Sequence, residues 1–260
     1  MVDDPIAGAL ALLPHAITAT GRASTAEAAV LYQTSLMSAL VEGVYEGDMT
    51  YGELHRHGDF GLGTFNGLDG EMIGFDGVFY QLRSDGSARI VTDDQRTPFA
   101  VVTFFTSALS VQIDGLGKEE ATQRLKSVSE QNMFTAVRID GRFRRVVTRT
   151  VRAQHRPYPP LQDAAKGEKE AVFEHVDGTL AGFWTPAYAG TLGVPGFHLH
   201  FISADRAAGG HVLDYVVDSA AAKLCPVDTF HVELPHTAAF RDAALNDPDL
   251  SAKIAAAEGE

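Results

Sequence analysis

The sequence predicts an α+β fold that is rich in strands, arranged as two α/β domains with mixed and antiparallel sheets. Short apolar segments that alternate with polar residues recur along most of the chain. Gly, Asp and Asn separate them, as is typical of antiparallel strands and turns. Only a few segments have the spacing of a helix. The sequence contains no Gly-rich phosphate loop of the dinucleotide-binding or P-loop type, so a nucleotide-binding α/β fold is not expected.

The first half of the chain is expected to begin with a helix and to continue as strands. Residues 24–27 (STAE) resemble a helix cap, and the apolar residues from there to about Val41 suit an amphipathic helix. Residues 118–131 have the pattern of a second helix. Turn residues punctuate the remaining segments, and the clearest strands are expected at 72–80, 99–105, 133–139 and 143–152.

A proline cluster gives the best candidate for a domain boundary. Pro157, Pro159 and Pro160 end the strand pattern, and the charged residues 166–170 follow them. We therefore expect an N-terminal α/β domain at residues 1–156 and a C-terminal strand-rich domain at residues 157–260. The second half is expected to hold strands at 171–175, 179–185, 198–203, 211–218 and 227–234, and a helix at 237–245.

Three histidines in the C-terminal half are the most informative feature of the chain. Side chains alternate between the two faces of a strand, so His198 and His200 share one face and their apolar neighbours take the other. Residues 204–210 have the small residues and glycines of a chain reversal. A hairpin centred between positions 205 and 206 places His211 opposite His200. The three imidazoles then form a site for a divalent metal, for which zinc is expected, with a position left for water or substrate.

Two alternatives compete with this interpretation. His55 and His57 form a second pair on a strand-rich chain, which suggests a cupin-like metal oxygenase or isomerase, but residues 58–66 lack the glutamate that such a site needs. The other alternative is a ligand-binding module in which zinc only joins two strands. A structural zinc site is normally closed by four protein ligands, often Cys, and the hairpin offers three histidines.

The composition excludes several classes of partner. With 45% hydrophobic and 21% charged residues the chain is an ordinary globular protein, and 34 acidic against 21 basic residues give a net charge of -13. This charge disfavours nucleic acids and anionic membranes. The single cysteine, Cys225, excludes an intramolecular disulfide. Residues 6–17 are apolar but follow acidic residues and contain Pro14, so a cytoplasmic protein without a secretory signal is expected.

Several short blocks of sequence, each weak alone, are specific in combination. They are 58–65 (GDFGLGTF), 68–72 (LDGEM), 157–161 (PYPPL), 196–201 (GFHLHF) and 209–211 (GGH). In this order they resemble the alpha-acetolactate decarboxylase family, and the similarity extends from about Leu31 to Glu258. The resemblance implies a homodimeric zinc enzyme of two α/β domains. Its substrate would be the 2-hydroxy-3-keto acid 2-acetolactate, which it would convert to acetoin and carbon dioxide.

The resemblance also assigns functional residues. It places the three zinc ligands on His198, His200 and His211, and two functional glutamates on Glu71 and Glu258. The active-site arginine falls on Arg149, which would bind the substrate together with Thr64, although a shifted alignment could exchange Arg149 with Arg152. Without the resemblance these residues would receive ordinary structural interpretations, because most charged side chains are solvated and chain ends fray. Those interpretations are a turn for Glu71, an exposed sheet position for Arg149, a plain strand residue for Thr64 and a tail for Glu258.

The chemistry of this reaction suits such a metal site. When the carboxylate of 2-acetolactate leaves, two electrons enter the neighbouring ketone and an enediolate forms. Chelation of the ketone and the tertiary hydroxyl by zinc is expected to stabilise its charge. Glu71 or Glu258 would deliver the proton that completes acetoin, and the residues alone do not decide between them. Arg149 would complement the charge of the substrate carboxylate or of the developing oxyanion.

Overall fold

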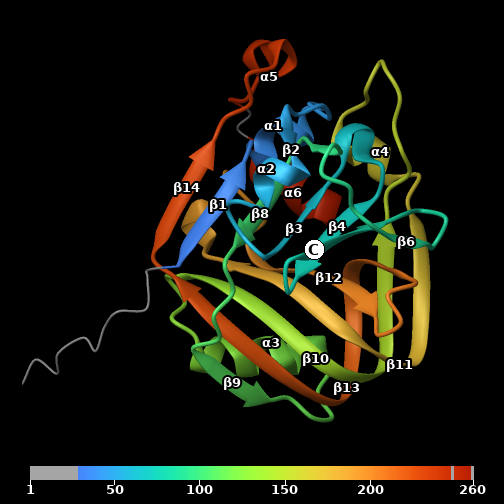
Figure 1. Ribbon diagram of the computed structural model, residues 1–260, viewed down its shortest axis with the longest axis vertical. Coiled ribbons are helices and arrows are strands. Elements are labelled where there is room, and N and C mark those ends of the chain that lie inside the picture. Colours follow the sequence, from blue (N-terminus) through green and yellow to red (C-terminus); the bar gives the residue numbers. More distant parts are fainter. Residues whose placement is uncertain (1–28, 247–248, 259–260) are drawn as a thin grey trace, which may run out of the picture.

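Two sheets make up most of the molecule (Figure 1). The structure, a computed structural model, describes residues 29–246 and 249–258. One sheet has seven strands, and the other has five strands and closes on itself. The first sheet is mixed because β1 and β14 are parallel, and all pairs of the second are antiparallel. The expected strand-rich α+β class with mixed and antiparallel sheets is therefore confirmed.

The seven-stranded sheet gathers strands from both ends of the chain. Its first strand in the sequence, β1, lies between β14 and β8. Two further strands, β2 (Met49–Thr50) and β7 (Arg96–Thr97), pair with each other in a separate two-stranded sheet. The order across the large sheet is β14 (Thr229–Glu233), β1 (Val30–Thr34), β8 (Ala100–Thr103), β3 (Phe60–Thr64), β4 (Glu71–Phe75), β5 (Val78–Leu82) and β6 (Ala88–Ile90).

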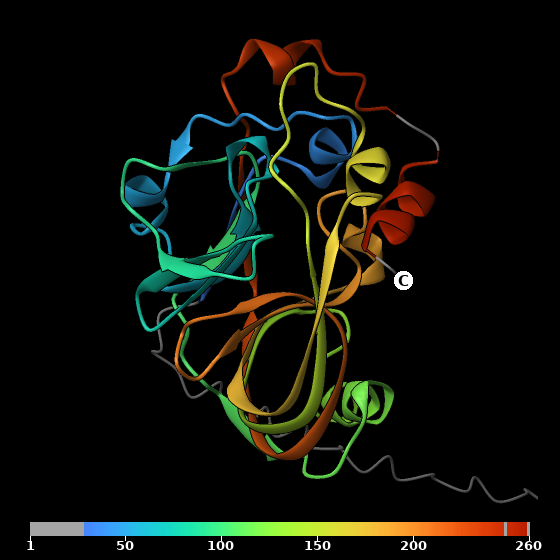
Figure 2. The same ribbon diagram turned by 90° about the vertical axis from the view of Figure 1, so that its right-hand side faces the viewer.

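The second sheet is a closed barrel, seen from the side in Figure 2. Because β10 pairs with both β11 and β13, and β12 joins β11 to β13, four strands complete a ring. The fifth strand, β9, pairs only with β13 within the described chain. The strands are β9 (Leu109–Gln112), β10 (Phe134–Thr150), β11 (Lys169–Thr185), β12 (Gly196–Ser203) and β13 (Gly209–Val227).

Alternate residues of the barrel strands contribute to two different cores. Leu199 and Phe201 pack with Phe143 in one apolar cluster, formed mainly by the barrel strands themselves. Ile202 belongs to a second cluster that also contains Leu62 and other residues of the seven-stranded sheet. The outer face of β12 is thus covered by the seven-stranded sheet, and the histidines of β12 lie on this face.

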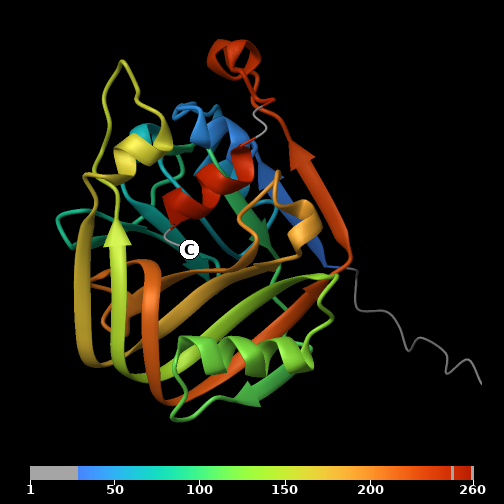
Figure 3. The same cartoon turned by 180° about the vertical axis from the view of Figure 1, so that it is seen from behind.

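Short helices cover the junction between the two sheets. In Figure 3, α1, α4 and α6 lie together above the barrel strands, and each contacts the other two. The longest helix, α3, packs Ala121 and Leu125 against the barrel core. Among the described residues, no helix has both the length and the apolar character needed to cross a membrane. The helices are α1 (Met37–Val41), α2 (Tyr51–Leu54), α3 (Lys118–Val128), α4 (Leu161–Ala165), α5 (Ala238–Asp242) and α6 (Leu250–Glu258), with 3-10 turns at Asn66–Leu68 and Ala187–Ala189.

The helix expected from residue 24 to about Val41 is wrong over most of the part that the structure describes. Residues 24–28, and residues 6–17 further upstream, lie outside the described chain. Val30–Thr34 form β1, and only Met37–Val41 are helical. Leu31 and Tyr32 are buried between two neighbouring strands, so pairing within the sheet overrides the helical spacing of the apolar residues. The helix expected at 118–131 is confirmed as α3 up to Val128, where it ends.

The boundary expected at residues 156/157 does not separate the two sheets. β9 and β10 precede it but belong to the barrel, and β14 follows it but belongs to the seven-stranded sheet. The predicted pairs of short strands on either side of it are also each one long strand, β10 and β11. Register shifts near Phe143 let β10 bend around the barrel without ending. In the sequence this bend interrupts the alternation of apolar and polar residues, so the pattern predicts two short strands.

Two glycines permit the tight packing of β13 between its neighbours. A Cβ on Gly209 would lie 2.0 Å from the carbonyl oxygen of Phe201, and one on Gly210 would lie 2.7 Å from that of Arg149.

We expect Gly209→Ala to lower the free energy of unfolding by about 1–3 kcal/mol, because the backbone of β12 would have to move. Urea unfolding measures this cost. Gly167→Ala is the control, since its nearest atom is 3.7 Å away, and equal midpoints for the two variants would contradict the argument.

Candidate metal centre

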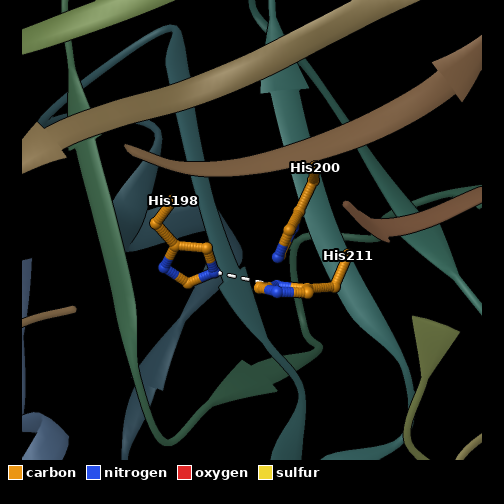
Figure 4. Close-up of side chains that lie close together, drawn as sticks. All are labelled: His198, His200 and His211. Atoms are coloured by element: carbon orange, nitrogen blue, oxygen red, sulfur yellow. Dashed lines mark hydrogen bonds between the residues drawn. The ribbon is translucent and has the colours of Figure 1, made fainter. Parts of the chain in front are cut away.

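The three histidines converge as the hairpin predicts (Figure 4). His198 and His200 lie on β12 and His211 lies on β13, and His200 and His211 are direct partners in the antiparallel register. One ligand atom from each ring lies within 4.8 Å of the others. They form the single group of three or more potential metal-binding side chains found in the described part of the chain. The predicted hairpin register is therefore confirmed, and the three residues can hold a metal ion.

Two rows of cross-strand partners face one another at this centre. Around the barrel, His200 pairs with His211 and His211 pairs with Arg149 on β10. In the seven-stranded sheet, Thr64 on β3 pairs with Glu71 on β4. Partners in a sheet direct their side chains to the same face, so each row presents its groups together. Four of the five residues are buried, and Glu71 is partly buried.

A hydrogen bond to the neighbouring sheet orients His200. Its Nδ1 is 2.7 Å from the carbonyl oxygen of Met72, which can only accept, so Nδ1 carries the proton and Nε2 keeps its lone pair. That Nε2 is buried and has no hydrogen-bond partner within the described structure. Metal-binding histidines commonly use one nitrogen in this way and ligate through the other. The unsatisfied Nε2 is thus an observation in favour of a metal ligand.

The other two rings approach each other at a distance that suits a shared metal. Nε2 of His198 and Nδ1 of His211 are 3.2 Å apart. Zinc–nitrogen bonds of about 2.0–2.1 Å in tetrahedral geometry separate two ligand nitrogens by about 3.3–3.4 Å. The pair therefore lies within a few tenths of an ångström of the spacing that zinc needs.

Burial keeps two of the histidines, His198 and His200, in the neutral form that a metal requires. Loss of hydration lowers the pKa of both His198 and His200 to about 3, and the positive charge of Arg149 acts in the same direction. His200 is 1% exposed. A neutral imidazole is the ligand form, so protons do not compete for these nitrogens near neutral pH.

The histidines line a pocket of about 50 Å³ at the junction of the sheets. Glu71 approaches His200 in it, with 3.8 Å between Oε2 and Nε2. The Thr64 hydroxyl donates a hydrogen bond of 2.8 Å to the carbonyl of Gly70, so its oxygen can also accept one from a ligand. The rest of the wall is mainly apolar and contains Met37, Leu40, Leu68, Phe99, Val151 and Leu161.

Arg149 lies in the pocket wall, whereas Arg152 is exposed. The Arg149 guanidinium donates from Nη2 to the carbonyl of Ala257 and forms an ion pair with Glu168. Ala257 belongs to α6, so residues 250–258 fold back over the pocket as a helix and are not the frayed tail that composition favours. Glu258 is the last residue of this helix, and its side chain lies outside the described part of the structure.

Comparison with known proteins assigns the chain that carries this site to a family. A model of the family described as alpha-acetolactate decarboxylase matches residues 31–247. The chain belongs to the alpha-acetolactate decarboxylase family. It is 46% identical over 231 residues to the alpha-acetolactate decarboxylase of Bacillus subtilis strain 168, covering 88% of this chain and 91% of the relative. It is 45% identical over 234 residues to that of Klebsiella aerogenes, covering 88% and 89%.

A solved structure agrees with the sequence comparison. The crystal structure of the Bacillus subtilis strain 168 alpha-acetolactate decarboxylase superposes with a TM-score of 0.87 at 45% identity, covering 89% of this chain and 100% of that one. The resemblance stated from the sequence blocks is therefore confirmed. The predicted enzyme class, a decarboxylase and hence a carboxy-lyase, is confirmed with it.

The competing histidine pair lies outside the metal centre of this decarboxylase family member. His55 stacks on Phe79 with 4.2 Å between ring centroids, and His57 stacks on Tyr32 at 3.8 Å. The two rings thus pack on different aromatic partners, and neither belongs to the three-histidine group. The structure gives no support to the cupin-like alternative.

Two features of the centre escaped the sequence analysis. The carbonyl of Met72 has no sequence signature, because every residue carries one and only the packing of β4 against β12 selects it. Glu168 lies in a charged run that is typical of a solvated boundary, and its pairing with Arg149 depends on the β10–β11 register. Neither feature leaves a local signal in this decarboxylase sequence.

The buried histidines predict a pH-dependent stability for the metal-free protein. The pKa of His200 is about 3 in the folded state against about 6.5 in an unfolded chain, so below pH 6.5 only the unfolded state takes up this proton. The free energy of unfolding should then decrease as the pH is lowered below 6.5, by about 1.4 kcal/mol per pH unit for this group. Urea unfolding in chelator at pH 7, 6 and 5 tests this against His200→Gln, which should show a shallower decline. Parallel declines would contradict it.

Proposed function

We propose that this chain decarboxylates 2-acetolactate to acetoin and carbon dioxide, with a zinc ion held by His198, His200 and His211. The observation that carries the proposal is the cluster of three convergent imidazoles in a pocket that also contains Glu71 and Arg149. Family membership supports the reaction. The small, mainly apolar pocket suits a small substrate.

The donor set fits zinc. Three imidazole nitrogens suit zinc, copper, iron or nickel, and the decarboxylation is redox-neutral, so a metal without redox chemistry is sufficient. Three protein ligands leave coordination positions for substrate oxygens, as in catalytic zinc sites. When bound, the zinc supplies a Lewis acid for the negative charge that develops on the ketone oxygen as the enediolate forms.

Arg149 and Thr64 are proposed to bind and orient the substrate. In a chain of net charge -13, an anionic substrate needs a local cation, and the buried Arg149 guanidinium provides one in the pocket wall. Its planar donors match a carboxylate. Thr64 lies in the opposite row, where its oxygen can accept a hydrogen bond from a substrate hydroxyl. The apolar wall limits water around the carboxylate, which favours its release as neutral carbon dioxide.

Glu71 and Glu258 are the carboxyl groups proposed to handle the proton. The bond from C2 to the carboxylate breaks, its electron pair enters the ketone, and one proton must then reach carbon to give a single acetoin enantiomer. Glu71 lies in the pocket beside His200. Glu258 ends the helix that covers the pocket. One of them would donate the proton while the other orients the substrate hydroxyl.

We also propose a homodimer, as the family resemblance implies, and a cytoplasmic location, for which the acidic residues before the apolar segment 6–17 are the reason. Light scattering tests the dimer, which should have twice the 27.9 kDa mass of one chain. The buried Cys225 fits a reducing compartment. Neither nucleic acid nor membrane is proposed as a partner, because the net charge is strongly negative.

Zinc content and acetoin production test the proposal directly. We expect about one zinc per chain and acetoin release from 2-acetolactate that chelator abolishes and added zinc restores. His211→Ala should lose both metal and activity, because two imidazoles hold zinc far more weakly than three. His55→Ala is the control and should keep both. A wild-type protein that binds zinc but leaves 2-acetolactate unchanged would favour the structural-zinc alternative.

The two glutamates can be tested one at a time. Glu71→Gln and Glu258→Gln keep side-chain shape but remove the ionisable proton, and each should lower kcat by about 10²–10⁴-fold if it transfers or positions that proton. Truncation after Glu258 is the matched control and should keep activity. Full turnover in Glu258→Gln would leave Glu71 as the proton donor. Melting temperatures near that of the wild type show that the variants remain folded.

A further inference from the structure

Among the contacts that hold Arg149, two come from separate described elements. Nη1 lies 3.3 Å from Oε1 and 3.1 Å from Oε2 of Glu168, the residue immediately before β11, and Nη2 donates to the Ala257 carbonyl on α6. The arginine side chain is 7% exposed and the glutamate side chain is 23% exposed. Both contacts reach the end of the guanidinium that carries Nη1 and Nη2, so together they limit its rotation.

The Arg149–Glu168 pair differs from the other ion pairs of this segment. Lys166 and Asp163, close by in sequence, form a pair whose side chains are 77% and 47% exposed, and such pairs contribute little. The Arg149–Glu168 pair is mostly withdrawn from water, where charge interactions are stronger and geometry matters more. Glu170 is the direct partner of Arg149 in the β10–β11 ladder, yet its side chain is exposed.

The site also has a reason to need a carboxylate behind Arg149. A divalent metal bound by the three histidines and the Arg149 guanidinium would place like charges together in one pocket. A carboxylate on the side of Arg149 that faces α4 and β11 offsets part of this charge.

We infer that Glu168 is a positioning residue for Arg149, which it holds at the angle from which the guanidinium meets the substrate carboxylate. Glu168 does not itself touch the substrate. Its effect passes through Arg149, with the Ala257 carbonyl as the second support. This inference rests on the proposed decarboxylation for its kinetic consequence, but the orientation of Arg149 can also be tested by ligand binding alone.

The experiment compares Glu168→Ala, Glu168→Gln and the control Glu170→Ala, each as the full-length zinc-loaded enzyme. Glu168→Ala should lower kcat/KM for 2-acetolactate by about 10–100-fold, because small misplacements of a binding group are costly. Glu168→Gln should recover part of the loss, since its amide oxygen still accepts from Nη1 although the negative charge is gone. Glu170→Ala should stay within about twofold of the wild type, as expected for an exposed side chain.

A double-mutant cycle shows whether the effect passes through Arg149. In an Arg149→Lys background the guanidinium is already gone, so adding Glu168→Ala should change kcat/KM by less than about threefold. The same fold-loss in both backgrounds would overturn the inference. If thermal melting shows that Glu168→Ala is not folded, Glu168→Asp replaces it. The shorter side chain of Asp should not reach Arg149 in the same way, so this variant should lose activity that Glu168→Gln keeps.

Binding of a non-reacting ligand separates this inference from the proposed function. 2-Hydroxy-2-methylpropanoate carries the 2-hydroxy carboxylate but no ketone, so it cannot lose carbon dioxide by the same route. Calorimetry should show weaker binding to Glu168→Ala than to Glu170→Ala. Unchanged affinity and unchanged kcat/KM in folded Glu168→Ala would refute the positioning role. Absence of acetoin formation by the wild type, with the binding difference intact, would refute only the proposed function.

Discussion

The hydrogen bond from His200 to the Met72 carbonyl is the contact on which the centre depends. It joins β12 of the barrel to β4 of the seven-stranded sheet at the residue next to Glu71. Because it fixes the tautomer of His200, it also directs Nε2 toward the pocket. His211 is then placed by its register with His200, and Arg149 by its register with His211. One contact between the sheets therefore aligns a whole row of functional groups.

Exclusion of water has two consequences at this junction. It lowers the pKa of His198 and His200, which keeps them available as ligands, and it strengthens the interaction between Arg149 and Glu168. The apolar side chains around the pocket produce both effects. The nonpolar wall is thus part of the electrostatics of the site, and a polar substitution there would change ligand protonation as well as packing.

The sequence predicted the local parts of this molecule better than the distant ones. The hairpin register followed from strand alternation and a short reversal, both of which are set by adjacent residues, and it was correct at His200 and His211. The first helix was wrong because β14 and β8 bury Leu31 and Tyr32 in a sheet, and neither strand is near them in sequence. The choice between Arg149 and Arg152 likewise needed the barrel register.

The position of β14 and α6 at the end of the chain has a consequence for folding. β1 acquires its parallel partner only when β14 has been made, and the Ala257 carbonyl reaches Arg149 only after α6 has formed. Contacts between such distant segments require closure of long loops, which slows folding. The barrel hairpin that brings the histidines together is synthesised earlier. During synthesis the histidine cluster can therefore assemble before α6 closes its pocket.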